Sequence, residues 1–207
     1  MMTSLTDRQK NRREEIIEAA LNIFYQKGFY SMKIEEVAQA AGIGKGTVYE
    51  YFRSKEELMA AAIEFEFSEL EQKISDSADK EKTLAGKLAA IVCQVIRHQQ
   101  TQKDIVRVSF QEISGCVYDL HRIMETRQRR FMDQFSVMID EAAARGEIRP
   151  VNPRILMGAL MGALFGLSRS AQGDDKCKFF FDCRDMEPER IGREVSDLII
   201  YGLARRE

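Results

Sequence analysis

The stretch "IEEVAQAAGIGKGTVYEYF", which ends at Phe52, constrains the fold of this chain more than any other segment. Val37 and Ala41 are four residues apart, as are Val48 and Phe52, so each short segment has the apolar face of a helix. Between them, the glycines of Gly42-Ile43-Gly44 supply flexible backbone and the isoleucine supplies one apolar anchor. Two short amphipathic helices around a three-residue turn predict a helix-turn-helix element.

The letters of Gly44-Lys45-Gly46-Thr47 also resemble a phosphate-binding loop, which would indicate a nucleotide-binding enzyme. That loop requires G-x-x-x-x-G-K-[ST] between a buried strand and a helix. Here the position five before Gly44 is Gln39, Gly46 follows the lysine, and the upstream pattern is helical. Both the spacing and the context therefore argue against the nucleotide-binding interpretation.

Helical signals continue along the chain. Thr6 and Gln9 have the spacing of a capping box, and Gly28 is placed to end the helix that follows. Ser54 and Glu57 form a second capping box at the start of a longer helix. No segment shows the sustained two-residue alternation of a strand. We predict an all-α fold of about nine helices, with later helices at about 83–99, 104–114 and 119–144 and after Pro153 and Pro188.

The charge is unevenly distributed along the 207 residues. The whole chain has a formal net charge of −2, whereas residues 1–55 contain nine Lys/Arg and seven Asp/Glu. A weakly basic head on an acidic body fits a polyanion contact at one end. A solvated helix face would give the same counts, so the charge pattern alone does not decide the function.

Neither the N-terminus nor the longest apolar run suggests export or a membrane. Residues 1–13 lack the apolar run of a secretory signal. The run from Ile155 to Leu167 falls short of the roughly 20 residues needed to cross a bilayer and has an arginine on each side. We therefore expect a cytoplasmic protein with no membrane partner.

The cysteines do not predict a metal site or a disulfide framework. No two of them have CxxC spacing, and the chain has only two histidines to complete a ligand set. We expect the four cysteines to be reduced thiols, and we expect neither a metal nor a cofactor. These cysteines are Cys93, Cys116, Cys177 and Cys183. Cys177 and Cys183 could alternatively bridge or bind a metal. The segment "DDKCKFFFDCRD" around them could cover a pocket or a second subunit, or form a local hydrophobic plug. No GxSxG, HExxH or paired-carboxylate motif indicates an enzyme.

Burial of Val48 and Phe52 fixes which residues of their helix face outward. The expected outward row is Gly46, Thr47, Tyr49 and Glu50, with Tyr51 on the flank. Such a row, with a lysine at each end, suits a groove lined with phosphates. An ordinary helical hairpin with exposed tyrosines is the alternative interpretation.

The segments "IIEAALNIFYQKGF" and "GFYSMKIEEVAQAAGIGKGTVYEYFRSKEELMAAAI" resemble the N-terminal DNA-binding domain of the tetracycline-repressor (TetR) family of bacterial transcriptional regulators. The similarity covers about residues 10–65. It implies three DNA-binding helices within residues 1–54 and a helical ligand-binding and dimerisation body over residues 55–207. It also implies a homodimer that a small ligand usually releases from DNA.

The resemblance assigns DNA contacts by position. Lys45 matches the family residue that heads the recognition helix and reaches base edges. Thr47, Tyr49 and Tyr51 fall where the family contacts phosphates or groove edges. Lys55 matches a phosphate-binding lysine at the start of the fourth helix, where the helix dipole adds partial positive charge.

The remaining candidates for DNA contact are less regular. Gly46 and Glu50 face outward, and Glu50 could accept a hydrogen bond from cytosine N4 or simply weaken non-specific binding. Lys33 stands where the family commonly has a serine or threonine that caps the second helix and contacts phosphate. Lysine cannot accept a capping hydrogen bond, so either this helix end frays or Ser31 helps to cap it. Lysine can still hold a phosphate from this position. Gly44 replaces another common serine cap, at a cost of only a few tenths of a kcal/mol.

Two segments near the C-terminus are candidates for a dimer interface. Gly158, Gly162 and Gly166 form a smooth stripe on one helix, where another backbone can come close. The last helix has a one-sided apolar row of Ile191, Val195, Leu198 and Ile199. The resemblance implies that these helices form a four-helix interface between two subunits. Alternatively, the two stripes pack against each other within one chain.

A ligand pocket in the body is the least specific prediction. The apolar residues that could line it, and that also suit an ordinary core, are Phe65, Ile91, Val95, Phe110, Ile113 and Met161. The ten methionines of the chain suit an adaptable apolar pocket, although they suit ordinary packing as well.

Together these observations predict a ligand-responsive transcriptional regulator, and in particular a repressor, that binds double-stranded DNA. Two copies of the short recognition helix, held roughly 34 Å apart or a little more, would bind a near-palindromic operator. A small apolar or amphipathic effector would release the dimer. The alternatives are a helical nucleotide-binding enzyme and an adaptor that binds only proteins.

Overall fold

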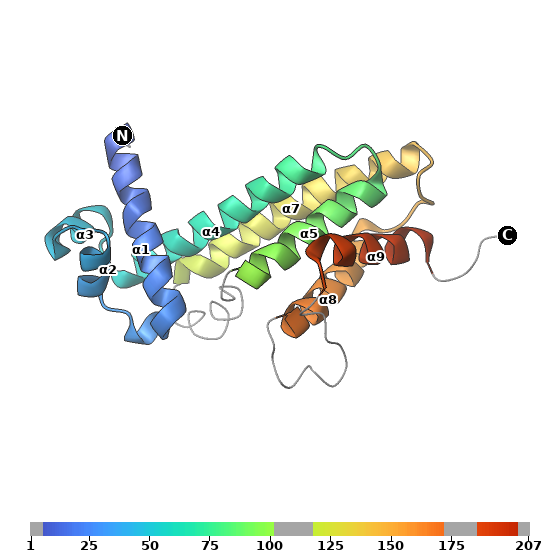
Figure 1. The fold of residues 1–207 in the computed structure, drawn as a ribbon. Coiled ribbons are helices and arrows are strands. Elements are labelled where there is room, and N and C mark those ends of the chain that lie inside the picture. The colour runs from blue at the N-terminus through green and yellow to red at the C-terminus, as the bar shows by residue number, and fades with distance from the viewer. Residues whose placement is uncertain (1–5, 102–117, 172–185, 203–207) are drawn as a thin grey trace. The chain divides into compact units, whose positions relative to one another are not determined.

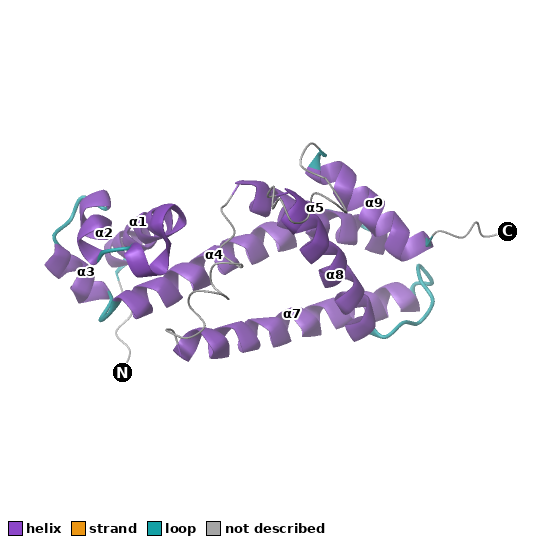
Figure 2. Cartoon of the chain, turned by 90° about the horizontal axis from the view of Figure 1, so that it is seen from below, coloured by secondary structure: helices purple, strands orange, loops and turns teal. Residues whose placement is uncertain are grey.

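The computed structural model describes residues 6–101, 118–171 and 186–202 (Figure 1). Within these ranges the regular structure consists of eight α-helices, with no strand (Figure 2). The all-α prediction is confirmed. The helix expected over 104–114 lies outside the described residues. The eight helices are α1 (Asp7–Ser31), α2 (Ile34–Ala40), α3 (Lys45–Tyr51), α4 (Lys55–Ala78), α5 (Leu84–Thr101), α7 (Tyr118–Ala144), α8 (Pro153–Ala171) and α9 (Pro188–Tyr201).

The helix starts follow the capping signals in the sequence. The Thr6 hydroxyl accepts from the backbone N–H of Gln9, and the Gln9 side chain accepts from the backbone N–H of Thr6 at 2.9 Å. At the start of α4, Ser54 Oγ accepts from the Glu57 N–H and the Glu57 carboxylate accepts from the Arg53 N–H. The Thr6 box is reciprocal. At Ser54 only the half made by the N-cap hydroxyl is present, because the Glu57 carboxylate bonds the N–H of Arg53, the residue before the N-cap, in place of that of Ser54.

Gly28 interrupts α1 as its position predicts. Its φ of 75° and ψ of 169° are non-helical, and the helix resumes for a short turn that ends at Ser31. The Met32 N–H then bonds the carbonyl oxygen of Gly28 at 3.2 Å. Because L residues rarely adopt this positive φ, glycine is required where the chain leaves the long part of α1.

The turn between α2 and α3 is a Schellman motif. The Ile43 N–H donates to the Ala38 carbonyl at 2.9 Å, and the Gly42 N–H donates to the Gln39 carbonyl at 3.1 Å. Gly42 has a φ of 66°, in the left-handed region that this motif requires. The Ile43 side chain packs against the buried core, so the apolar residue of the turn anchors both helices.

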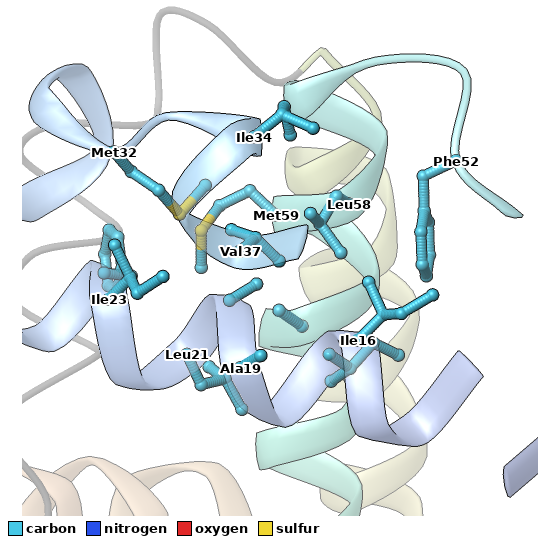
Figure 3. Close-up of a cluster of buried hydrophobic side chains, with 14 of the residues drawn as sticks. Ile16, Ala19, Leu21, Ile23, Met32, Ile34, Val37, Phe52, Leu58 and Met59 are labelled. Atoms are coloured by element: carbon cyan, nitrogen blue, oxygen red, sulfur yellow. The ribbon is translucent and has the colours of Figure 1, made fainter. Parts of the chain in front are cut away.

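The described residues divide into two compact units. The first contains residues 6–68 and 118–125, and the second contains 69–101, 126–171 and 186–202. In the first unit, α1, α2 and the beginning of α4 enclose one hydrophobic core. Figure 3 shows Ile16 of α1, Val37 of α2 and Met59 of α4 directed toward this core.

The second unit has its own core, built by α5, α7, α8 and α9. Gly192 of α9 lies so close to α5 that a Cβ atom there would be 2.5 Å from the carbonyl oxygen of Ala89. Four residues further along α9, Ser196 Oγ donates to the carbonyl oxygen of Ala85 on α5 at 2.6 Å. A glycine and a serine therefore allow the two helix backbones to approach closely.

The loop after α7 stabilises the start of α5. The Glu147 carboxylate accepts from the Leu84 N–H at 2.6 Å and from Arg145 Nε at 2.7 Å. The hydrogen bond from Leu84 is the main reason that the pKa of Glu147 is lowered, and Arg145 lowers this pKa further.

Among the described residues, no helix is apolar over a length sufficient to span a bilayer.

Candidate nucleic-acid interface

The inner side of α3 is fully buried. Val48 is 0% exposed and Phe52 is 2% exposed, as the four-residue spacing predicts. The Arg13 guanidinium lies over the Phe52 ring, 5.0 Å from its centroid, so α1 covers this ring with a cation. These two residues fix the rotation of α3 about its own axis.

The outer side of α3 faces solvent. Gly46 and Glu50 are exposed, and Tyr49 is 45% exposed although it is a large aromatic residue. A Cβ atom added to Gly46 would have no neighbour within 4 Å, so another molecule can approach the backbone closely there. Thr47 is half-buried, and Tyr51 is half-buried with its ring packed against the core.

Lys45, the first residue of α3, is held by a carboxylate of α2. Its Nζ lies 2.6 Å from Glu35 Oε1 and 5.8 Å from the centroid of the Tyr49 ring. The hydrogen bond between Lys45 and Glu35 is the largest cause of a lowered pKa for Glu35 and a raised pKa for Lys45. Both groups therefore remain charged at neutral pH.

Lys55, the first residue of α4, is held by the end of α1. Its Nζ donates to the backbone carbonyl of Tyr30 at 3.3 Å and lies 4.5 Å from the centroid of the Phe29 ring. An ammonium group has three donors, so Lys55 can keep the Tyr30 carbonyl and still bind an anion. The same lysine thus joins two helices of the first unit.

Lys33 is exposed at the N-cap of α2 and, like Gly44 before α3, makes no side-chain capping hydrogen bond. The predicted loss of both caps is confirmed. On the first turn of α2, the Glu36 carboxylate pairs with Lys27 Nζ at 2.6 Å, which lowers the pKa of Glu36. Each of the two neighbouring glutamates of α2 therefore has its own lysine.

Sequence patterns did not indicate the partners of these lysines. Glu35 is ten positions before Lys45, and Tyr30 is twenty-five positions before Lys55. No rule of helical spacing connects residues so far apart. The one available signal was the acidic pair of "IEE" shortly before a helix that begins with a lysine.

The residues predicted to line a ligand pocket belong to different clusters. Phe65 packs against the core of the first unit, whereas Ile91 and Val95 belong to the core of the second. Met161 is 50% exposed on α8. Phe110 and Ile113 lie outside the described residues, as do Cys177 and Cys183.

The predicted dimer residues separate into an exposed set and a buried one. Gly158 and Gly162 are exposed, and Cβ atoms added to them or to Gly166 would have no neighbour within 4 Å. Leu198 of α9 is 51% exposed. In contrast, Ile191 is 2% exposed and belongs to the core of its own unit, so its side chain is not available to a partner. Val195 and Ile199 are half-buried against that core.

Comparison with known proteins identifies the family. Residues 16–62 match the model of bacterial regulatory proteins of the tetR family, and residues 81–169 match that of the tetracyclin repressor-like C-terminal domain. The chain belongs to the TetR family. It is a ligand-responsive DNA-binding transcriptional regulator and not an enzyme, in agreement with the resemblance found in the sequence.

Individual TetR-family proteins match over most of their length. The uncharacterized HTH-type transcriptional regulator YfiR of Bacillus subtilis is 28% identical over 157 residues, which cover 74% of this chain and 76% of the relative. The structure of the transcriptional regulator FadR from Bacillus subtilis in complex with stearoyl-CoA superposes with a TM-score of 0.73 at 18% sequence identity. The match covers 92% of this chain and 99% of the FadR chain. The structure of AibR in complex with isovaleryl coenzyme A and operator DNA has a TM-score of 0.68 at 17% sequence identity, and the match covers 91% of this chain and 98% of the AibR chain.

Proposed function

We propose that this TetR-family protein is a cytoplasmic repressor that binds a near-palindromic operator as a homodimer and leaves it when an amphipathic effector binds. The observation that carries the proposal is the rotation of α3. Burial of Val48 and Phe52 leaves Gly46, Tyr49 and Glu50 on an exposed face. A helix held in this way suits insertion into the major groove of B-DNA.

Base edges and phosphates would be contacted by different residues of the first unit. Lys45 begins α3 and can donate to guanine O6 and N7, while Tyr49 and Glu50 lie on the same exposed face. Lys33 and Lys55 lie at the starts of α2 and α4 and not on α3. They would therefore bind backbone phosphates beside the groove and not base edges within it. Thr47 and Tyr51 are half-buried and would add contacts at the groove edge.

The dimer would form through α8 and α9. The glycines of α8 are open, and Ile155 on the same helix is 73% exposed. Small residues next to exposed apolar ones suit close packing against another helix. A two-fold axis would pair each α8 with its copy and place two α3 helices on successive turns of DNA.

We propose an acyl thioester as the effector. FadR and AibR, which share this fold, were solved with stearoyl-CoA and isovaleryl coenzyme A respectively. Met132 and Met138 of α7 pack at the margin of the core of the second unit, together with Val95. Methionine side chains adapt to irregular apolar shapes, which suits an acyl chain of variable length.

Selection of bound duplexes from a random DNA pool with the full-length protein tests the proposed operator. We expect a near-palindrome, and we expect Lys45→Ala to weaken binding to it by about 5- to 150-fold, the range for one specific base contact. Lys73→Ala is the matched control, because Lys73 is an exposed lysine of the second unit paired with Glu69. The proposal would be overturned if no sequence were enriched or if the two substitutions had equal effects.

A release experiment tests the proposed effector. We expect palmitoyl-CoA, but not coenzyme A alone, to release the protein from the selected duplex.

A further inference from the structure

Glu35 is an acidic side chain next to a cation of the proposed DNA-binding face. Its carboxylate lies 2.6 Å from Lys45 Nζ, and the two side chains are 59% and 50% exposed. Lys45 lies in turn near the ring of Tyr49, the most exposed aromatic residue of α3. The ammonium of Lys45 is thus positioned between a carboxylate and an aromatic face before any DNA arrives.

This pairing affects two kinds of DNA contact differently. Binding to phosphates depends on net charge, because each neutralised phosphate releases a counterion. A lysine that is already neutralised by a carboxylate contributes little to that term. A hydrogen bond to a base edge depends instead on the direction of the donor, and an ammonium group has two further donors while one is held by Glu35.

We propose that Glu35 is a specificity-determining residue that acts through Lys45. It fixes the direction of the Lys45 ammonium toward base edges and cancels its charge toward phosphates, so it weakens binding to random DNA more than binding to the operator. This inference depends on the proposed function, since it requires that α3 binds an operator.

Glu36 provides a matched control. It is the next residue on α2, also a glutamate, and also pairs with a lysine at 2.6 Å, but that lysine is Lys27 of α1. Glu35→Gln and Glu36→Gln remove the same charge from the same helix turn and keep the side-chain length. Only the first substitution frees Lys45. Thermal unfolding of both variants shows whether the fold is retained.

The experiment measures dissociation constants at several salt concentrations for the selected operator duplex and for a scrambled duplex of equal length and composition. One additional released counterion at 0.1 M salt corresponds to about 8-fold in affinity. We therefore expect Glu35→Gln to bind the scrambled duplex about 5- to 10-fold more tightly, with a salt slope steeper by about 1, and to change operator affinity by less than about 2-fold.

A double-mutant cycle with Lys45→Ala tests whether Glu35 acts through Lys45. We expect the effect of Glu35→Gln on the scrambled duplex to fall below about 2-fold when Lys45 is absent. If the effect of Glu35→Gln is undiminished in the Lys45→Ala background, Glu35 simply repels phosphates and the inference is overturned. The inference also fails if Glu35→Gln tightens both duplexes equally or does not tighten binding of the scrambled duplex. An equal effect of Glu36→Gln would contradict it as well. If the wild-type protein shows no preference for the selected duplex, the proposed function itself fails.

Discussion

Among the helices that the structure describes, α3 and α8 expose glycines, and the surroundings of these glycines differ. On α3, Gly46 lies among charged and aromatic side chains, with Lys45 before it and Glu50 after it. On α8, Gly158 and Gly162 lie among apolar side chains, including Ile155 and Met161, which are both exposed. Both glycine faces permit close approach of another molecule. The charged face suits a polyanion and the apolar face suits another helix, so the neighbours of a glycine indicate its partner.

The largest expected effect comes from removing the buried anchor of α3. Phe52→Ala deletes a ring that is 2% exposed, and such truncations cost about 3–5 kcal/mol. We expect DNA binding to be lost together with the stability of the first unit, measured by urea unfolding. Tyr49→Ala, on the exposed side of the same helix, should change stability by less than about 0.5 kcal/mol. Equal stability of the two variants would show that α3 is not oriented as described.

Filling the apolar glycine face should separate the subunits without unfolding them. Gly162→Leu places a large side chain where the chain itself has no atom within 4 Å of an added Cβ. We expect the dimer dissociation constant to rise about 100-fold, equivalent to about 2.7 kcal/mol, measured by sedimentation equilibrium. A dimer of unchanged affinity would show that this face of α8 lies outside the interface.

Gly192 supplies the contrasting control for that experiment. There an added Cβ would meet the Ala89 carbonyl oxygen at 2.5 Å, and the neighbouring backbone cannot move away easily. Gly192→Ala should therefore lower the free energy of unfolding by about 1–3 kcal/mol.

The second unit also contains a charge-dependent contact, which pH can test. Glu147 accepts a hydrogen bond from the Leu84 N–H, and its pKa is lowered in the folded protein. Its stabilising contribution is present above the unfolded pKa of about 4.3 and is lost as the pH falls through the lower, folded value. We expect Glu147→Gln to cost about 1 kcal/mol at pH 7 and almost nothing near pH 2, by urea unfolding at each pH. A difference that is independent of pH would show that the charge does not matter.

The smallest expected effects compare two glycines of the first unit. Gly46 has helical backbone and open space, so Gly46→Ala should stabilise the first unit by about 0.5–1 kcal/mol. Gly42 has a φ of 66°, where alanine is strained, so Gly42→Ala should destabilise it by about 1 kcal/mol. Thermal unfolding resolves the two signs, and effects of the same sign would contradict the assigned turn geometry.

Local rules predicted most of the fold. The capping box at Thr6, the hydroxyl cap at Ser54 and the break at Gly28 depend on residues within four positions of one another, and the structure contains all three. The reciprocal half of the box predicted at Ser54 is absent, because Glu57 bonds the Arg53 N–H. The burial of Val48 and Phe52 followed from helical spacing in the same way. The division into residues 1–54 and 55–207 that the family resemblance implied stays a prediction.

Tertiary contacts were predicted less well, because they join residues that the sequence separates. The apolar row of α9 did not reveal that Ile191 is buried in its own unit while Leu198 is exposed. Gly192 was not singled out, although a Cβ atom there would lie 2.5 Å from the backbone of another helix. Likewise, the pairing of Lys45 with Glu35 depends on how α2 and α3 cross, which helical spacing does not specify.

The close contact at Gly192 has a consequence for protein engineering. In a library that randomises α8 and α9 to change subunit pairing, position 192 will tolerate almost nothing larger than hydrogen, because the Ala89 carbonyl fills the space. Positions 158 and 162 can vary widely in size at little expense to folding of the single chain. New pairing specificities could therefore be sought on α8 while α9 is kept constant.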